Sequence, residues 1–138
     1  MKIKLLSAFA LVAFSFTAVR AAEAMDEKQF QKLMKEVGNV AKQFKDHSAA
    51  KNAAVVAKDS ARTAEIYKQM AAFWKARMTD EAAKLSEQSA AAAGATAMAA
   101  KAGDWNKVKS SWGVVGQNCK SCHEKFREKL DDGSYKIK

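Results

Sequence analysis

Proline is absent from this 138-residue sequence, and cysteine and histidine occur only twice each. A proline inside a helix removes a hydrogen bond and clashes with the preceding turn, so its absence leaves long helices uninterrupted. A structural zinc site takes four protein ligands, usually from two cysteine or histidine pairs, and this chain has few such ligands. A chain of this length is expected to form one domain.

The first 24 residues have the layout of a secretory signal peptide. The basic start Met1–Lys4 precedes an almost unbroken apolar run, Leu5–Val19, and small residues follow at positions 21, 22 and 24. The run is shorter than the about 20 apolar residues that span a bilayer, which argues against a retained membrane anchor. We therefore expect cleavage after Ala21 or Ala24 and a periplasmic domain formed by residues 25–138.

The chain is basic, with a formal net charge of +9. Removal of residues 1–24 takes away Lys2, Lys4, Arg20 and Glu23, which leaves +7. Acidic residues are interspersed with the basic ones and no nucleic-acid-binding motif occurs, so we expect no nucleic-acid partner. A redox partner with an acidic docking surface fits the charge, because complementary charge speeds protein encounter.

The segment after Met25 shows no strand-like alternation and is rich in good helix formers. Breaks are expected near Ser48, which can cap the next helix, near the N-cap residue Thr79, and at Gly103. In the last segment, apolar residues recur every three or four positions, the spacing of one helical face. The stripe consists of Trp105, Val108, Trp112, Val115, Cys119, Cys122, Phe126 and Leu130. The sequence predicts an all-α protein, an antiparallel up-down-up-down four-helix bundle with helices over residues 26–45, 49–77, 80–102 and 105–130.

The chemistry is concentrated in the segment Cys119-Lys120-Ser121-Cys122-His123. In a helix, Cys119, Cys122 and His123 stand at positions i, i+3 and i+4, so their side chains project from one face. Two thiols at this spacing can add to the two vinyl groups of one haem, and the imidazole that follows can then ligate the iron. The spacing is the attachment signature of c-type haem and predicts one covalently bound haem c.

Three other interpretations compete with haem attachment. A redox-active dithiol is expected between a strand and a helix, and no strand is predicted here. A zinc site would need further ligands, and the remaining histidine, His47, lies far away in the sequence. A disulfide between Cys119 and Cys122 would close too short a loop to stabilise a fold appreciably. The motif and the export signal together favour the haem.

The carboxy-terminal third of the chain resembles the class II c-type cytochromes, the cytochrome c′ family. The resemblance rests on Ala99–Asp104, on Val115-Gly116, and on the run from Cys119 to Arg127 that includes the motif. It implies an exported four-helix bundle whose haem is bound near the carboxy terminus. It also implies that Phe126 packs near the haem and that Arg127 helps to hold its proximal side. Family members often form homodimers through their first two helices, so a homodimer is left open.

The resemblance also bears on the second axial ligand of the iron. High-spin members leave this position empty, whereas low-spin relatives place a methionine of the first helix there. The segment Gln31–Lys35 resembles the low-spin relatives and puts Met34 at the expected position. Methionine on a helix is also an ordinary core residue. High-spin members carry an arginine four residues earlier that reaches a haem propionate, and Phe30 stands there in this chain.

Three functions follow from these observations. The first is an electron carrier without a catalysed reaction, in which Cys119 and Cys122 tether the haem and His123 and Met34 ligate the iron as proximal and distal ligands. The second is a gas-binding protein with an open sixth site for nitric oxide or carbon monoxide. The third is a helical interaction module without haem. The absorption spectrum distinguishes all three.

Overall fold

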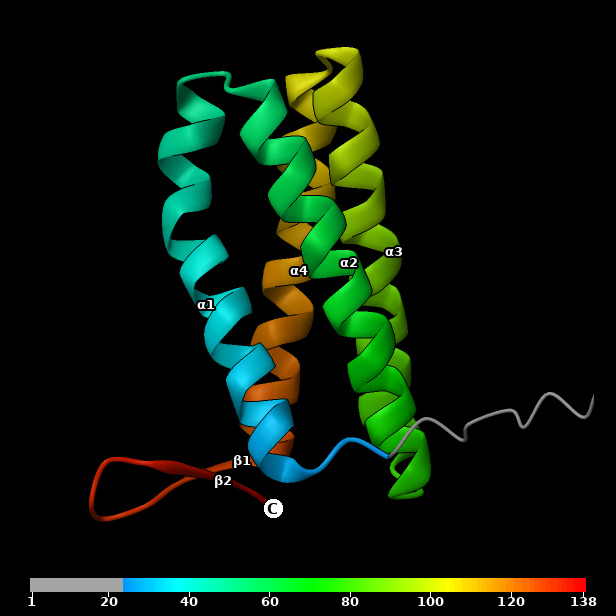
Figure 1. Ribbon diagram of the computed structural model, residues 1–138, viewed down its shortest axis with the longest axis vertical. Helices are drawn as coiled ribbons and strands as arrows, with labels where there is room; N and C mark the ends of the chain where they lie inside the picture. Colours follow the sequence, from blue (N-terminus) through cyan, green and yellow to red (C-terminus); the bar gives the residue numbers. More distant parts are fainter. Residues whose placement is uncertain (1–23) are drawn as a thin grey trace, which may run out of the picture.

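The structure is a computed structural model that describes residues 24–138. The predicted signal peptide therefore lies outside the described residues, except for its last position. The described chain forms four helices, α1 Glu27–Ala49, α2 Ala53–Ala76, α3 Asp80–Ala102 and α4 Trp105–Phe126, followed by a short hairpin of β1 Arg127–Lys129 and β2 Tyr135–Ile137. The helices run alternately up and down (Figure 1), which confirms the predicted four-helix bundle.

α1 starts one residue later than predicted and ends four residues later. Asp26 caps the helix: its carboxylate accepts a hydrogen bond from the Gln29 amide at 2.7 Å, and the Gln29 side chain accepts one from the Asp26 amide. This reciprocal pair satisfies two amides that the first helical turn leaves without partners. At the other end α1 continues four residues past the predicted end and includes Ser48.

Ser48 was therefore wrongly predicted to cap α2. Its hydroxyl donates to the Lys45 carbonyl within α1, and the Asn52 side chain caps α2 by accepting from the Val55 amide. The chain leaves the helical conformation at Lys51, whose φ is 52°. Nothing before that residue opposes a helix, so α1 runs up to the turn.

The two helices in the middle of the sequence make the closest contact. α2 and α3 share the most extensive interface, α4 packs chiefly on α3, and α1 rests mainly on α2 with less contact. The buried residues of α3 are all alanine, serine or threonine. Small side chains allow the axes of neighbouring helices to approach closely. The large buried side chains come instead from α2, and they include Ile66, Met70 and Trp74.

The carboxy terminus differs most from the prediction. The last helix, predicted to reach residue 130, ends at Phe126, and Arg127 takes up extended backbone angles. The two strands pair antiparallel, with Arg127 opposite Ile137. Gly133 has a φ of 82°, and the Asp132 carboxylate accepts from both the amide and the hydroxyl of Ser134, which fixes the turn. An aspartate followed by a glycine is a hairpin-turn signal, although Leu130 continues the helical spacing.

The hairpin is held against the start of α1. Ile137 packs against the main core cluster, and the Gln31 amide group donates to the Tyr135 carbonyl at 3.4 Å. A two-stranded hairpin is marginally stable in isolation, so these contacts with the bundle are what order it. Among residues 24–138, no helix is both long and apolar enough to cross a membrane.

Two glycines, one inside α3 and one at its end, provide a test of backbone strain. Gly103 ends the helix in the left-handed region, with a φ of 73°, whereas Gly94 lies inside it; a Cβ at either position meets nothing within 4 Å. We expect Gly103→Ala to lower the free energy of unfolding by about 1 kcal/mol, because a side chain disfavours this conformation. Gly94→Ala should instead raise it by up to about 1 kcal/mol through helix propensity.

Urea unfolding followed by circular dichroism measures both effects. Gly94→Ala is thus the matched control for Gly103→Ala, because it makes the same substitution where the backbone is helical. Equal changes at the two positions would contradict the assigned conformation of Gly103.

Candidate functional site

The last two turns of α4 bring the motif residues together. Cys119, Cys122 and His123 all lie within the helix, so their spacing places them on one face as predicted, and each is half-buried. Both cysteines are free thiols. Among the described residues, no group of three or more histidine, cysteine or acidic side chains is arranged to hold a metal ion. The motif offers two thiols and one imidazole, whereas a structural zinc site takes four protein ligands.

A tyrosine from a different helix contacts the first cysteine. The hydroxyl of Tyr67, on α2, lies 2.9 Å from the Cys119 sulfur, and the tyrosine is only 5% exposed. This residue was not predicted from the sequence. It lies 52 positions before Cys119, and no local pattern marks it, because the contact depends on how α2 and α4 pack.

Burial sets the protonation of the motif. It raises the pKa of the Cys122 thiol to about 11, with a further contribution from the neighbouring Cys119 and Glu81. Burial also raises the pKa of Cys119, although the hydrogen bond with Tyr67 opposes this effect. The pKa of His123 is lowered by burial and by the charge of Arg127. At neutral pH the cysteines are thiols, and the imidazole is neutral, the form that binds a metal ion.

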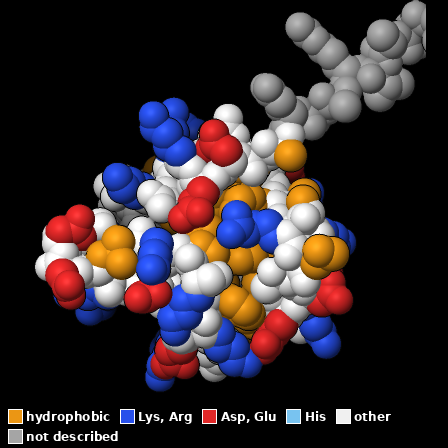
Figure 2. All heavy atoms as spheres, turned by 90° about the horizontal axis from the view of Figure 1, so that it is seen from below, with side chains coloured by type: hydrophobic (Ala, Val, Ile, Leu, Met, Phe, Trp, Pro, Cys, Tyr) orange, Lys and Arg blue, Asp and Glu red, His pale blue; other side chains and the backbone are white. Residues whose placement is uncertain are grey.

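The surface around the motif is apolar and incompletely covered. Figure 2, which views the bundle from below, shows hydrophobic side chains gathered between charged ones at the end where α4 stops. Several residues that border the main core cluster are only half-buried, and they come from α1, α4 and the hairpin. The set includes Leu33, Met34, Trp112, Cys119, Phe126 and Ile137.

A buried polar group next to the motif also lacks a partner. The side-chain nitrogen of Asn118 is buried and makes no hydrogen bond with any described residue. An unpaired buried donor costs about 1–3 kcal/mol, so such groups usually mark a bound group or water. Two thiols, a neutral imidazole, apolar surroundings and a spare donor together fit a haem.

The comparison with protein families agrees with a site that fits a haem. The family model described as Cytochrome C′ matches residues 7–127, which is most of the chain. The chain belongs to the cytochrome c′ family. Family membership implies a covalently bound haem c, and the match ends where the hairpin begins. Comparison with curated proteins and with solved structures gave no match.

The other residues singled out for this cytochrome c′ family member lie on α1 and where α4 joins β1. Met34 is half-buried on α1 and borders the same core cluster as Cys119. Phe126 is the last residue of α4, and its ring centroid lies 5.6 Å from that of Trp74. Arg127 begins β1 and is exposed, with its guanidinium 4.2 Å from the centre of the Tyr135 ring. Their contacts with a haem stay predictions.

Phe30 occupies the position where high-spin family members carry an arginine. It is 7% exposed and packs its ring against Phe73 at 4.6 Å and Trp74 at 5.3 Å between centroids. An arginine could not replace it without burying a charge in this aromatic cluster. Phe30 is thus a core residue in this chain.

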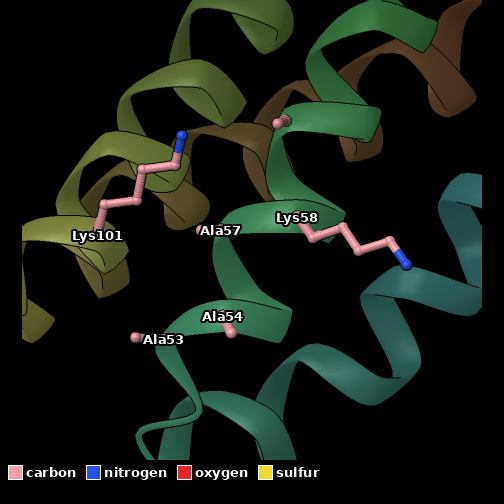
Figure 3. Close-up of a pocket in the computed structure, with 6 residues that line it drawn as sticks. Ala53, Ala54, Ala57, Lys58 and Lys101 are labelled. Atoms are coloured by element: carbon pink, nitrogen blue, oxygen red, sulfur yellow. The ribbon is translucent and has the colours of Figure 1, made fainter.

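Two grooves on the outer surface between α2 and α3 lack the chemistry of the motif. One, of about 520 Å3, is lined by alanines with Lys58 and Lys101 at its margins (Figure 3). The other, of about 420 Å3, lies further along the same interface between α2 and α3. Neither is lined by a sulfur or an imidazole. His47, near the end of α1, is also separate from the motif.

The contact between Tyr67 and Cys119 generates a prediction. Once Cys119 forms a thioether its sulfur has no proton, so the Tyr67 hydroxyl must be the donor. We expect Tyr67→Phe to lower the free energy of unfolding of the haem-loaded protein by about 1 kcal/mol, the usual net value of a hydrogen bond. The matched control is Tyr135→Phe, because Tyr135 is 45% exposed and should tolerate the change. Urea unfolding measures both, and an equal effect of the two substitutions would rule out a stabilising contact.

Proposed function

We propose that this protein is a periplasmic monohaem electron carrier with no catalysed reaction of its own. The observation that carries the proposal is the placement of Cys119, Cys122 and His123 on one half-buried face of α4, beside apolar side chains. Cytochrome c′ family membership supports it, because the matched segment contains the whole motif.

The motif residues divide the work of holding the haem. Cys119 and Cys122 form the two thioethers, and His123 supplies the proximal ligand. The haem, when bound, supplies reversible one-electron exchange between ferric and ferrous iron. The chain fixes its position through the thioethers and keeps water away with the apolar side chains around the motif. Phe126 and Arg127 adjoin His123 at the end of α4 and are proposed to pack against the proximal side.

Met34 is proposed as the distal ligand. Its support is its place on α1, half-buried beside the same core cluster as Cys119, and its match to the methionine of low-spin relatives. A thioether is a soft ligand that suits haem iron, and methionine with histidine raises the reduction potential. If His123 and Met34 both ligated the iron, no open site would remain, which would favour electron transfer over gas binding.

The cellular setting follows from the same proposal. Residues 1–24 are proposed to be a cleaved signal peptide, so the mature protein acts in the periplasm without a membrane anchor. Its partners are then other redox proteins, with an acidic docking surface to match the basic charge.

The absorption spectrum of the protein matured with its haem tests the proposal. Low-spin bands with a weak thioether-to-iron band are expected. A high-spin spectrum would instead indicate a gas-binding protein, and no haem would indicate an interaction module.

The double substitution Cys119→Ala/Cys122→Ala should abolish haem staining in denaturing gels, because no other covalent tether is present. Undiminished staining would refute the attachment site.

Substitution of Met34 tests the distal ligand. Met34→Ala should convert the iron to a high-spin, five-coordinate or water-ligated form, since Lys35 is turned about 100° around the helix and does not replace the thioether. The reduction potential should fall, and carbon monoxide should bind readily to the reduced protein.

Leu33→Ala is the matched control for Met34→Ala. Leu33 is the neighbouring half-buried residue of α1, and its loss removes a similar volume without a sulfur. It should destabilise the bundle and leave the spectrum unchanged. If the two variants have the same spectrum as the parent, Met34 is a packing residue only.

A further inference from the structure

The outer side of α1 carries a row of lysines. Lys28, Lys32, Lys35 and Lys42 are all exposed, and at about 100° per residue they fall within an arc of about 80° of the helix. The row is about 21 Å long at the α-helical rise per residue. We call these four residues the lysine ridge. It lies opposite Phe30 and Val37, the buried residues of α1.

Acidic side chains do not neutralise the lysine ridge. None of its four lysines makes an ion pair with a described residue. The acid of α1 beside it, Glu36, is already held by Arg62 of α2 through two hydrogen bonds of 2.6 and 3.0 Å. The other acids of the helix are Glu27, at its first residue, and Asp46, in its last turn.

Several lysines of the other helices are paired with acids. Lys68 and Lys75 of α2, and Lys120 and Lys125 of α4, each pair with a glutamate. Lys58 of α2 extends towards α1 in Figure 3 and adds to the positive charge on that side. Exposed lysines without an ion-pair partner also occur among the described residues of α3 and α4, namely Lys84, Lys101, Lys107 and Lys109, but they do not form one row.

We propose that the lysine ridge is the docking surface for a redox protein with an acidic surface. This inference rests on the proposed electron-carrier function and names where its partner binds. Unpaired charges of one sign on an exposed surface steer an oppositely charged protein and raise its rate of association.

The position of the lysine ridge suits electron transfer. Met34 lies about 120° around α1 from the centre of the ridge, so the ridge and the face towards α4 are separated by one helix. A helix with its side chains is about 10–12 Å across. A partner on the ridge is therefore separated from the proposed haem pocket by a single layer of protein.

An anionic membrane and a second copy of the chain fit the lysine ridge less well. Helices that lie on membranes insert large apolar side chains beside their lysines, whereas the apolar side of α1 packs on the core. A twofold dimer through this surface would place lysines against lysines, which costs energy.

Electron transfer from a defined donor tests the lysine ridge. The probe is a pre-reduced plant-type [2Fe–2S] ferredoxin, an acidic protein of low potential, mixed with the ferric haem protein in a stopped-flow instrument. The second-order rate of the parent should fall as salt is added. The variant Lys28→Gln/Lys32→Gln/Lys35→Gln/Lys42→Gln should react about tenfold more slowly at low salt and lose most of the salt dependence.

The matched control removes the same charge from other faces of the bundle. Lys84→Gln/Lys101→Gln/Lys107→Gln/Lys109→Gln replaces four exposed lysines of α3 and α4 that make no ion pair with a described residue. It should react nearly as fast as the parent. Equal slowing of the two variants would show that only the net charge of the protein matters, and it would contradict the assignment of the lysine ridge as the docking surface.

Two further results would also overturn the inference. If the ridge substitutions change only the binding to phosphatidylglycerol vesicles, the ridge is a membrane-binding surface. If they change only the sedimentation coefficient, the ridge is an interface between two copies of the chain. A parent that is not reduced by the ferredoxin at any salt concentration refutes the carrier function itself. A parent that is reduced, with no difference between the variants, refutes only the ridge.

Discussion

The close packing of α2 against α3 is the constraint on which the rest of this structure depends. The interface is lined by alanine, serine and threonine, and several of the hydroxyl-bearing residues are almost completely buried. Thr63, Ser86, Ser89 and Thr96 each donate to the carbonyl four residues earlier in their own helix. These bonds satisfy the hydroxyls without a cross-helix partner, so the two backbones can approach closely. α4 then packs on this pair, and the Thr96 hydroxyl lies 2.8 Å from that of Ser111.

α1 is held by less contact than the other three helices. α1 buries only Phe30 and Val37 and leaves Leu33 and Met34 half-buried, on the side that borders the core. A core composed of protein side chains alone would be expected to cover such residues. The half-covered side of α1 and the motif on α4 adjoin one core cluster, and a large planar apolar group is the kind of ligand that would complete it. The family assignment implies haem c, and the half-covered apolar side of α1 is compatible with a group of that kind.

The ion pairs also differ between α1 and the other three helices. The pairs within and between α2, α3 and α4 include Lys75 with Glu87 and Lys125 with Glu81, and exposed pairs of this kind contribute little to stability. Their main effect is on the surface potential, because each ion pair cancels one positive charge. On α1 only Glu36 is paired, with Arg62 of α2, and the lysines stay unbalanced. The helix that packs least tightly therefore also carries a row of exposed lysines without ion-pair partners among the described residues.

The sequence by itself determined the class of fold and the attachment motif. Both are local: helix formation follows from propensity and three-to-four-residue periodicity, and the spacing from Cys119 to His123 sets a common face on any helix. Gly103 was identified as a helix end for the same reason, since a left-handed residue is a local requirement. The breaks near Ser48 and residue 130 were misplaced, because both segments continue a helical pattern. α1 runs on to the turn at Lys51, whereas α4 stops at Phe126 because Arg127 is extended and pairs with Ile137 in the hairpin.

Tertiary structure decided the features that join distant segments. The contact of Tyr67 with Cys119, the burial that raises the pKa of Cys122, and the pairing of Glu36 with Arg62 each depend on two helices meeting in one register. The hairpin belongs here too, because Ile137 is ordered by its packing on the bundle. A periodic sequence specifies which side of a helix is apolar, but which residue of another helix that side meets depends on helix lengths, turns and crossing angles together.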